Sequence, residues 1–513
     1  MPRVGSAAVK EQSVGVVEFV ALLLAGIGPL LALAHLSRLP PTVMLFGMGL
    51  LIGLLPGAPP VRLDPDLAIG LFLPPIIYAG TVQVTPHLLR HALLPGVAVG
   101  GAVALATVLG VAAAVRWVLL PGLGWTAAVL LGVVAALFDT RLFQEANGTP
   151  HVPRALADAL KAREMASRIV ALTVLALVLE VLQEGQAPTP AKAALDIAWD
   201  LAGGAAVGVL IGRVVLWLRD RVGPAPIEIA VSLAAPYLGA LAARSLDLSL
   251  AVVVIAAALT VSAARVDSRT GKARSSAEAR ISAMAFWEEA SLLVSSVLFL
   301  LAGLALPGAL AALGDWLVWQ AAAAAIGVLI LVMVIQWVGS LASTRLPPLR
   351  DALVKQGAAG HAAAASIMAW ASTRSVLGLI VVLSVPSEWP NGEPFVERGL
   401  LLLVAAMVIL GSVALQGLTL HRAVHAAALG GGKEAKGEEA RARRLAADAR
   451  SEAGLNDDRA DPEGFAAERR ALLRLREHNE IGDEALRRLL RETDLRKRVA
   501  EGDASPGAPP PQP

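Results

Sequence analysis

Long apolar segments recur along almost the whole chain, and they restrict it to one kind of architecture. About 13 of them are long enough to cross a bilayer core as helices, at roughly 13–35, 41–58, 66–82, 92–120, 124–148, 156–184, 194–219, 225–243, 247–265, 286–307, 316–343, 361–386 and 398–427. A backbone in lipid must satisfy its own hydrogen bonds, so open sheets are excluded. The sequence therefore predicts an all-α polytopic membrane protein.

Composition agrees with this fold class. Of the 513 residues, 56% are hydrophobic and only 17% are charged, whereas soluble domains carry about a quarter. The absence of cysteine excludes disulfides and thiolate chemistry. The sequence shows no phosphate loop, zinc spacing, catalytic triad or nucleic-acid motif, so it predicts neither an enzyme nor a cofactor-dependent or nucleic-acid-binding protein.

Basic residues divide unevenly between the two sets of loops, which predicts an orientation. One set holds most of them, including Arg90, Arg141, Lys161, Arg163, Arg269 and Arg350; the other holds little beyond Arg62, Lys192, Arg244 and Arg398. By the positive-inside rule the first set is cytoplasmic. We therefore expect a multi-pass protein of the cell membrane with its N-terminus outside and its C-terminal tail in the cytoplasm.

The C-terminal segment differs in character from the rest. Residues 434–452 are helix-forming and charged, and leucines recur at helical spacing between residues 462 and 500. We expect a transmembrane domain over residues 1–429, a cytoplasmic helical tail over 430–502, with a turn at Ile481-Gly482-Asp483, and a disordered C-terminus over 503–513.

Polar residues inside membrane spans mark functional sites by default. The candidates are Asp139 in LLGVVAALFDTRLF, Glu164, Ser167 and Arg168 in KAREMASRIVAL, Ser295 in FWEEASLLVSSVLFLLAGL, and Arg374 in MAWASTRSVLGLIVVL. Apolar residues flank Arg374 on both sides, so it needs a partner, and we expect Asp139 or Glu164 to provide it.

Each candidate also has a structural interpretation. Asp139 could be an interfacial residue beside Arg141, and Glu164 and Arg168, four residues apart, could form an ordinary helical ion pair. Ser295 could donate to its own helix, and the Pro74-Pro75 pair in LFLPPIIYAG could be only a kink.

Several motifs, in order, resemble those of the monovalent cation:proton antiporter family that contains the Na+/H+ exchangers. LFLPPIIYAG is similar to the family's third-span motif, and WASTRSV is similar to WAGLRGAV, with Arg374 kept. In FWEEASLLVSSVLFLLAG, Trp287, Phe299 and Gly303 fit, while Ser295 replaces an Asn. LQGLTL at 415–420 and NEIGDEALRRLLRETDL in the tail also match.

The resemblance implies a fold, an assembly and a function. It implies two inverted repeats whose broken helices, here the fifth and twelfth spans, cross at the bilayer midplane. It also implies a homodimer and exchange of a monovalent cation (Na+, K+ or Li+) for protons across the bilayer. Asp139, Ser167 and Ser295 would bind the ion, Glu164 and Arg374 would pair across the crossing, and Arg168 would act in gating or proton coupling.

The chain departs from the family pattern at the ion site itself. Arg168 stands where the family has Asn, and Ile169 where it has the ion-carrying Asp. Arg168 could then act as a tethered cation, because an arginine does not lose its proton at any working pH. Two further hypotheses stay open: a transport-silent membrane scaffold or sensor, and a transporter of a different, anionic solute.

Overall fold

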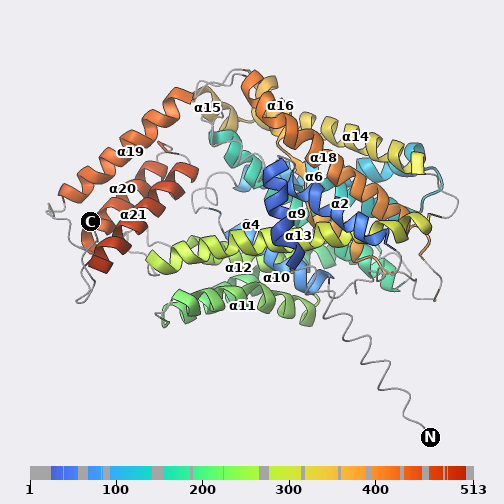
Figure 1. Ribbon diagram of the computed structural model, residues 1–513, viewed down its shortest axis with the longest axis horizontal. Coiled ribbons are helices and arrows are strands. Elements are labelled where there is room, and N and C mark those ends of the chain that lie inside the picture. Colours follow the sequence, from blue (N-terminus) through green and yellow to red (C-terminus); the bar gives the residue numbers. More distant parts are fainter. Residues whose placement is uncertain are drawn as a thin grey trace, which may run out of the picture.

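A computed structural model of the chain describes residues 25–37, 40–55, 68–82, 84, 93–140, 154–184, 189–222, 225–264, 277–313, 318–355, 360–386, 388, 392, 395–427, 432–452, 462–477, 480–481 and 483–503. Almost all of these residues are helical (Figure 1). The all-α membrane fold predicted from hydropathy is confirmed.

Seven of the described helices are long and apolar enough to cross a membrane. They are α6 (Leu93–Ala114) with its π-helical extension η2 (Val115–Leu119), α9 (Arg154–Glu184), α10 (Pro190–Arg219), α11 (Ala225–Ser245), α13 (Ala277–Ala311), α14 (Val318–Arg345) and α18 (Arg398–Ala427). Shorter apolar helices are Ala25–Ser37, α2 (Pro41–Gly53), η1 (Ala68–Phe72) with α4 (Leu73–Val82), α7 (Trp125–Ala136) and α12 (Leu250–Ala263).

Every predicted span overlaps a described helix. The first begins at residue 25 in the described part, so its predicted residues 13–24 lie outside it. The twelfth is interrupted: α16 (His361–Trp370) and α17 (Leu377–Leu383) are separate helices. The number of membrane crossings and the two inverted repeats stay predictions.

Close packing between helices depends on glycine where two backbones meet. At the crossing of α2 and α13, an added Cβ on Gly303 would lie 2.1 Å from the carbonyl oxygen of Phe46, and one on Gly49 would lie 2.1 Å from that of Leu300. Only a residue without a side chain allows this approach.

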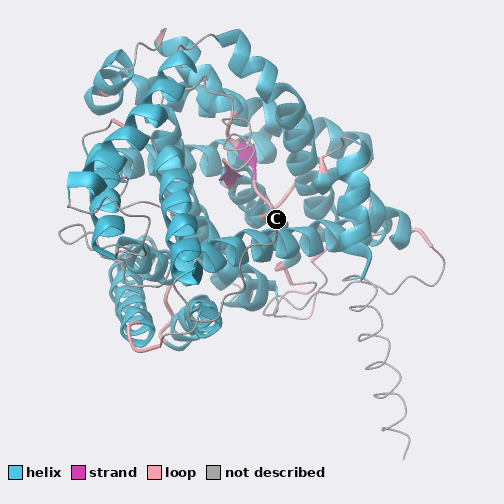
Figure 2. Cartoon of the chain, turned by 60° about the vertical axis from the view of Figure 1, so that its left-hand side comes forward, coloured by secondary structure: helices cyan, strands magenta, loops and turns pink. Residues whose placement is uncertain are grey.

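Two interrupted helices meet at the centre of the molecule. After α7 ends, β1 (Phe138–Asp139) pairs antiparallel with β2 (Thr373–Arg374), the short extended segment between α16 and α17. Figure 2 shows this two-stranded pair surrounded by helices. The predicted crossing of the fifth and twelfth spans is therefore present in the structure, although residues 141–153, the continuation of the fifth span, lie outside the described part.

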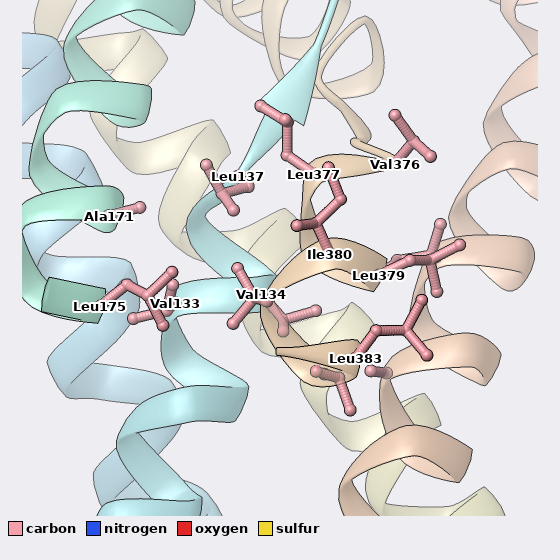
Figure 3. Packing of buried hydrophobic residues seen from close by; sticks show 14 of the residues in the cluster. Val133, Val134, Leu137, Ala171, Leu175, Val376, Leu377, Leu379, Ile380 and Leu383 are labelled. Carbon is pink, nitrogen blue, oxygen red and sulfur yellow. The ribbon is translucent and has the colours of Figure 1, made fainter. Parts of the chain in front are cut away.

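An apolar layer holds the two interrupted helices together. Val133, Val134 and Leu137 pack with Leu377 and Ile380 of α17, and α9 contributes side chains from its middle turns (Figure 3). These side chains are almost completely buried. The packing fixes the position of the extended segments relative to each other.

The tail forms three helices, α19 (Gly432–Glu452), α20 (Pro462–Glu477) and α21 (Asp483–Asp503), which lie together at one end of the molecule (Figure 1). They share a small apolar core that includes Ala446, Leu472, Ile481 and Leu489. An ion pair between Arg476 of α20 and Asp158 of α9, with 2.7 Å between guanidinium nitrogen and carboxylate oxygen, joins the tail to the transmembrane part.

Candidate functional site: the crossing of two interrupted helices

The site forms where α7 stops and the chain becomes extended. Asp139 lies in β1 and is 8% exposed. Its backbone carbonyl accepts a hydrogen bond of 2.9 Å from the Thr373 hydroxyl, and the Ser375 amide donates to the carbonyl of Leu137 at 3.1 Å. Asp139 is thus buried at the crossing. The alternative of an interfacial pair with Arg141 involves a residue outside the described part.

Backbone carbonyls left open by the interruption explain why this region is polar. The last carbonyls of a helix have no partner within it. Here the Ala135 carbonyl accepts from the Arg374 guanidinium and that of Ala136 accepts from the Ser167 hydroxyl at 2.6 Å. Together with the two bonds above, Thr373, Arg374, Ser375 and Ser167 therefore satisfy the carbonyls at the end of α7 and in the segment that follows it.

Arg374 has backbone oxygens as its partners, and the expected pairing with Asp139 or Glu164 is wrong. Its guanidinium donates to the Ala135 carbonyl at the end of α7 and, at 2.5 Å, to the Ser372 carbonyl just after α16. In the described part of the chain no carboxylate lies within ion-pair distance of Arg374. Its positive charge instead faces the negative ends of two helix dipoles.

Glu164 is fully buried and accepts hydrogen bonds from three side chains. The Thr140 hydroxyl donates to Oε2 at 2.6 Å, the Lys161 ammonium lies 3.2 Å from the same oxygen, and the Arg168 guanidinium donates to Oε1. The Glu164–Arg168 helical ion pair is confirmed. The expected Glu164–Arg374 pair is replaced by this cluster.

Arg168 lies between the two acids. One terminal nitrogen that bonds Glu164 is also 3.9 Å from the Asp139 carboxylate. The side chain is 2% exposed, and its Nε and NH1 have no hydrogen-bond partner. NH1 lies against the backbone of Gly80 in α4, where an added Cβ would be 2.5 Å away. Gly80 therefore provides the space that the guanidinium occupies.

Lys161 and Arg163 belong to this region, although the sequence placed both in a cytoplasmic loop. Helix α9 begins at Arg154, so both residues lie about two turns or more inside it. The buried Arg163 guanidinium donates to Ser340 and Gln336 of α14, both at 2.6 Å. One feature of the sequence could have shown that Lys161 belongs to the site. Lys161, Glu164 and Arg168 are separated by three and four residues, which puts them on one helix face.

The two candidate serines differ in their bonds. Ser167 donates to Ala136, as described above, and keeps lone pairs on its oxygen. Ser295 is 8% exposed and its hydroxyl has no hydrogen-bond partner; its neighbour Ser296 donates to the Leu292 carbonyl. The alternative that Ser295 bonds its own helix is wrong, and it is Ser296 that does so.

The Pro74-Pro75 pair also has a defined place. The π-helical turn η1 precedes α4, and both prolines lie in the first turn of α4. Prolines are tolerated at the start of a helix because the amides there have no partner within the helix. The π-helical turn therefore lies before the prolines, and α4 follows it directly and includes Gly80.

Two interrupted helices that cross inside an all-helical membrane bundle, with buried carboxylates at the crossing, define a secondary transporter. The chain belongs to the sodium/hydrogen exchanger family, whose transmembrane-domain model matches residues 19–426.

Relatives support this membership. An uncharacterized Na(+)/H(+) exchanger of Mycobacterium tuberculosis is 29% identical over 394 residues, which is 76% of this chain and 70% of the relative. The Na(+)/H(+) antiporter NhaP of Pseudomonas aeruginosa is 26% identical over 404 residues, 75% of this chain and 90% of the relative. The structure of the sodium proton antiporter MjNhaP1 from Methanocaldococcus jannaschii shares the fold with a TM-score of 0.60, 17% identity, and coverage of 80% of this chain and 98% of that one.

Proposed function

We propose that the chain is a secondary active transporter that exchanges a monovalent cation, Na+, K+ or Li+, for protons. Membership of the sodium/hydrogen exchanger family, and relatives named as Na(+)/H(+) antiporters, support this proposal. The observation that carries it is the Asp139 carboxylate, buried at the crossing of two interrupted helices. Carboxylate and hydroxyl oxygens suit a hard cation, so Asp139, Ser167 and Ser295 are the proposed ion-binding residues.

The charges around Asp139 favour a cation over an anionic solute. An anion would need the free donors of Arg168, but NH1 faces the backbone of Gly80 at close range. The nitrogen of Arg168 that points toward the site is already bonded to Glu164. Arg168 is therefore a permanent, tethered counter-ion, and we propose that it acts in gating or proton coupling.

Cation-driven proton flux in inverted membrane vesicles tests the function. After an imposed pH gradient quenches a pH-sensitive dye, addition of Na+, K+ or Li+ should restore fluorescence in vesicles that contain the protein and not in vesicles from cells without it. A response to chloride or another anion in place of cations would support an anion transporter. Silence to every solute would favour a scaffold or sensor.

Topology and assembly are proposed on the same basis. The charge asymmetry of the loops supports a cell-membrane location with the N-terminus outside and the tail, residues 430–502, in the cytoplasm. Family resemblance supports a homodimer of the transmembrane domain, residues 1–429. Protease protection of a tail epitope in right-side-out vesicles, and the mass of the detergent-solubilised protein, check these two points.

A further inference from the structure

We infer that Lys161 is the group that gives up and takes up the proton in each exchange cycle; this inference rests on the proposed function. The Lys161 ammonium is 3.2 Å from the buried Glu164 carboxylate, in the cluster that includes Arg168 and, 3.9 Å from Arg168, Asp139. Lys161 is thus part of the charged site itself.

The position of Lys161 suits proton exchange with water. Its side chain is 18% exposed, whereas those of Glu164 and Arg168 are 0% and 2% exposed. The side chain of Asp139, the fourth residue of the cluster, is 12% exposed, so Lys161 is the most exposed of the four. We therefore assign proton exchange with water to Lys161 rather than to the buried Glu164 or Arg168.

The chemistry of the other cations excludes them from this role. Arg168 and Arg374 carry guanidinium groups, which stay protonated in proteins, whereas a lysine ammonium can lose its proton in a buried site. Lys161 is the one lysine among the residues that the described cluster brings together. Only Lys161 can change the positive charge of the site.

The charge count gives the exchange its stoichiometry. Asp139 and Glu164 contribute two negative charges, and Arg168 and protonated Lys161 contribute two positive ones, so the net charge is zero. When the Nζ–H bond breaks and the proton leaves to water, the net charge is −1. An uncompensated buried charge is unfavourable, and one monovalent cation at Asp139 restores neutrality. One cation therefore enters for each proton that leaves.

Two other buried arginines near the site, Arg374 and Arg163, do not enter this count. Arg374 is directed at the carbonyl ends of α7 and α16, whose dipoles amount to about half a negative charge each. Arg163 faces away toward the side-chain oxygens of α14. Both guanidinium groups are bonded to oxygens outside the cluster of Lys161, Glu164, Arg168 and Asp139, so we leave their charges out of the count whether Lys161 is protonated or neutral.

Few other charged groups face Lys161. Those that act on it are Glu164, Arg168 and Asp139. Of the described helices packed against α9, α6, α7 and α12 carry no charged residue. Among the charged residues of its other neighbours, His361 of α16 is exposed, Arg350 and Asp351 of α15 pair with each other, and Asp158 of α9 pairs with Arg476. On α10, Lys192 pairs with Glu180, Asp200 accepts from the Ser249 amide, Arg219 pairs with Glu228 and Arg213 is exposed. Asp196 of α10 is half-buried, and one of its carboxylate oxygens has no hydrogen-bond partner.

Two substitutions separate the charge of Lys161 from its titration. Lys161→Arg keeps the positive charge but cannot release a proton, so we expect loss of both cation-driven proton flux and cation binding. Lys161→Gln gives the site a permanent net charge of −1. We therefore expect cation binding that no longer depends on pH, together with loss of proton flux. Lys192→Arg and Lys192→Gln, at an exposed lysine paired with Glu180, are the matched controls.

Flux and binding are read separately. Flux is measured in inverted vesicles, and binding as the Na+-dependent rise in melting temperature of the purified full-length protein between pH 6 and 9, because a ligand stabilises the state that binds it. In the wild type this stabilisation should grow as the pH rises. It should be absent in Lys161→Arg and equal at every pH in Lys161→Gln.

The outcomes distinguish this inference from the proposed function. If Lys161→Arg keeps wild-type flux, or if cation binding in Lys161→Gln keeps the wild-type pH dependence, Lys161 is not the proton carrier. Either result leaves the proposed exchange activity unaffected. A wild type without flux overturns the proposed function, and the binding measurement then still decides whether Lys161 couples protons to cations. If Lys161→Arg does not fold, Lys161→Gln alone decides the point.

Discussion

Arg374 satisfies the ends of two different helices with one side chain. Its two terminal nitrogens bind the Ala135 and Ser372 carbonyls, and its own amide donates to the Ser412 hydroxyl of α18 at 2.9 Å. The planar guanidinium is suited to this because it presents several donors in a fixed geometry. Arg374 therefore stabilises the interruption of both helices.

Replacing Arg374 by lysine should weaken the fold although the charge is kept. A compact ammonium cannot reproduce the two bonds in the same geometry, and each buried carbonyl left without a partner costs about 1–3 kcal/mol. Thermal unfolding of the detergent-purified protein measures the loss. Arg350→Lys, at an exposed arginine of α15, is the control.

A double-mutant cycle checks that Arg374 and Glu164 do not pair. If they act independently, the effects of Arg374→Gln and Glu164→Gln on stability should add to within about 0.5 kcal/mol. A coupling energy well above that value would show that Arg374 and Glu164 interact, as the sequence predicted, and would contradict the partners described here.

The sequence predicted which residues form the site more accurately than it predicted the groups to which those residues bond. Asp139, Glu164, Ser167, Arg168 and Arg374 lie at or next to the crossing, as predicted. The partners of Arg374 could not be predicted, because the carbonyls it binds become available only where the backbone leaves the helix. A sequence shows which carboxylates exist but not which carbonyls are left open.

At the scale of elements, hydropathy predicted the helices because a span must be long and apolar. It located the start of α9 to within two residues, at 156 against Arg154, but the division of basic residues between loops assigned Lys161 and Arg163 to a loop. The charges of KAREMASR lie inside α9, where they pair with one another or with α14. Burial of those charges depends on tertiary packing, which local composition does not show.

The contact between α2 and α13 leads to a prediction about Gly303. Gly303→Ala would put a Cβ 2.1 Å from the Phe46 carbonyl oxygen, so the helices would have to separate. We expect a loss of about 1–3 kcal/mol, typical of overpacking. Gly308→Ala, in the same helix with nothing within 4 Å of its Cβ position, should have little effect on the melting temperature. Equal effects of the two changes would contradict the close approach.

The tail helices should loosen in acid through Glu492 of α21. Glu492 accepts two hydrogen bonds, of 2.8 and 3.1 Å, from Arg443 of α19, and this bonding lowers the pKa of Glu492 below its usual value of 4.5. A carboxyl group whose pKa is lowered in the folded state stabilises the fold at pH values above its usual pKa. This contribution is lost as the pH falls through the lowered pKa.

Hydrogen exchange of the tail measures this effect. At pH 7, Glu492→Gln should reduce the protection of α19 and α21 relative to the wild type. The difference should shrink and then vanish as the pH falls below about 4.5. Asp448→Asn, at an exposed position of α19, serves as control. A difference that is the same at every pH would show that the bond to Arg443 does not stabilise the tail.

At the scale of the whole molecule, segments far apart in the chain build one charged site. β1 and β2 are more than two hundred residues apart yet pair directly, and α9 brings Glu164, Arg168 and Lys161 to them. The same α9 also carries Asp158, which pairs with Arg476 of the tail. A single helix therefore connects the proposed exchange site to the tail helices.

Asp139 is the residue on which the proposed exchange depends, because its carboxylate lies at the crossing and is the proposed cation ligand. Cation-driven proton flux in inverted vesicles should be lost in Asp139→Asn and kept in Asp351→Asn, which removes an exposed carboxylate of α15. Equal amounts of folded protein in the two vesicle preparations are required for the comparison. Flux in Asp139→Asn at the wild-type level would contradict an exchange site at this crossing.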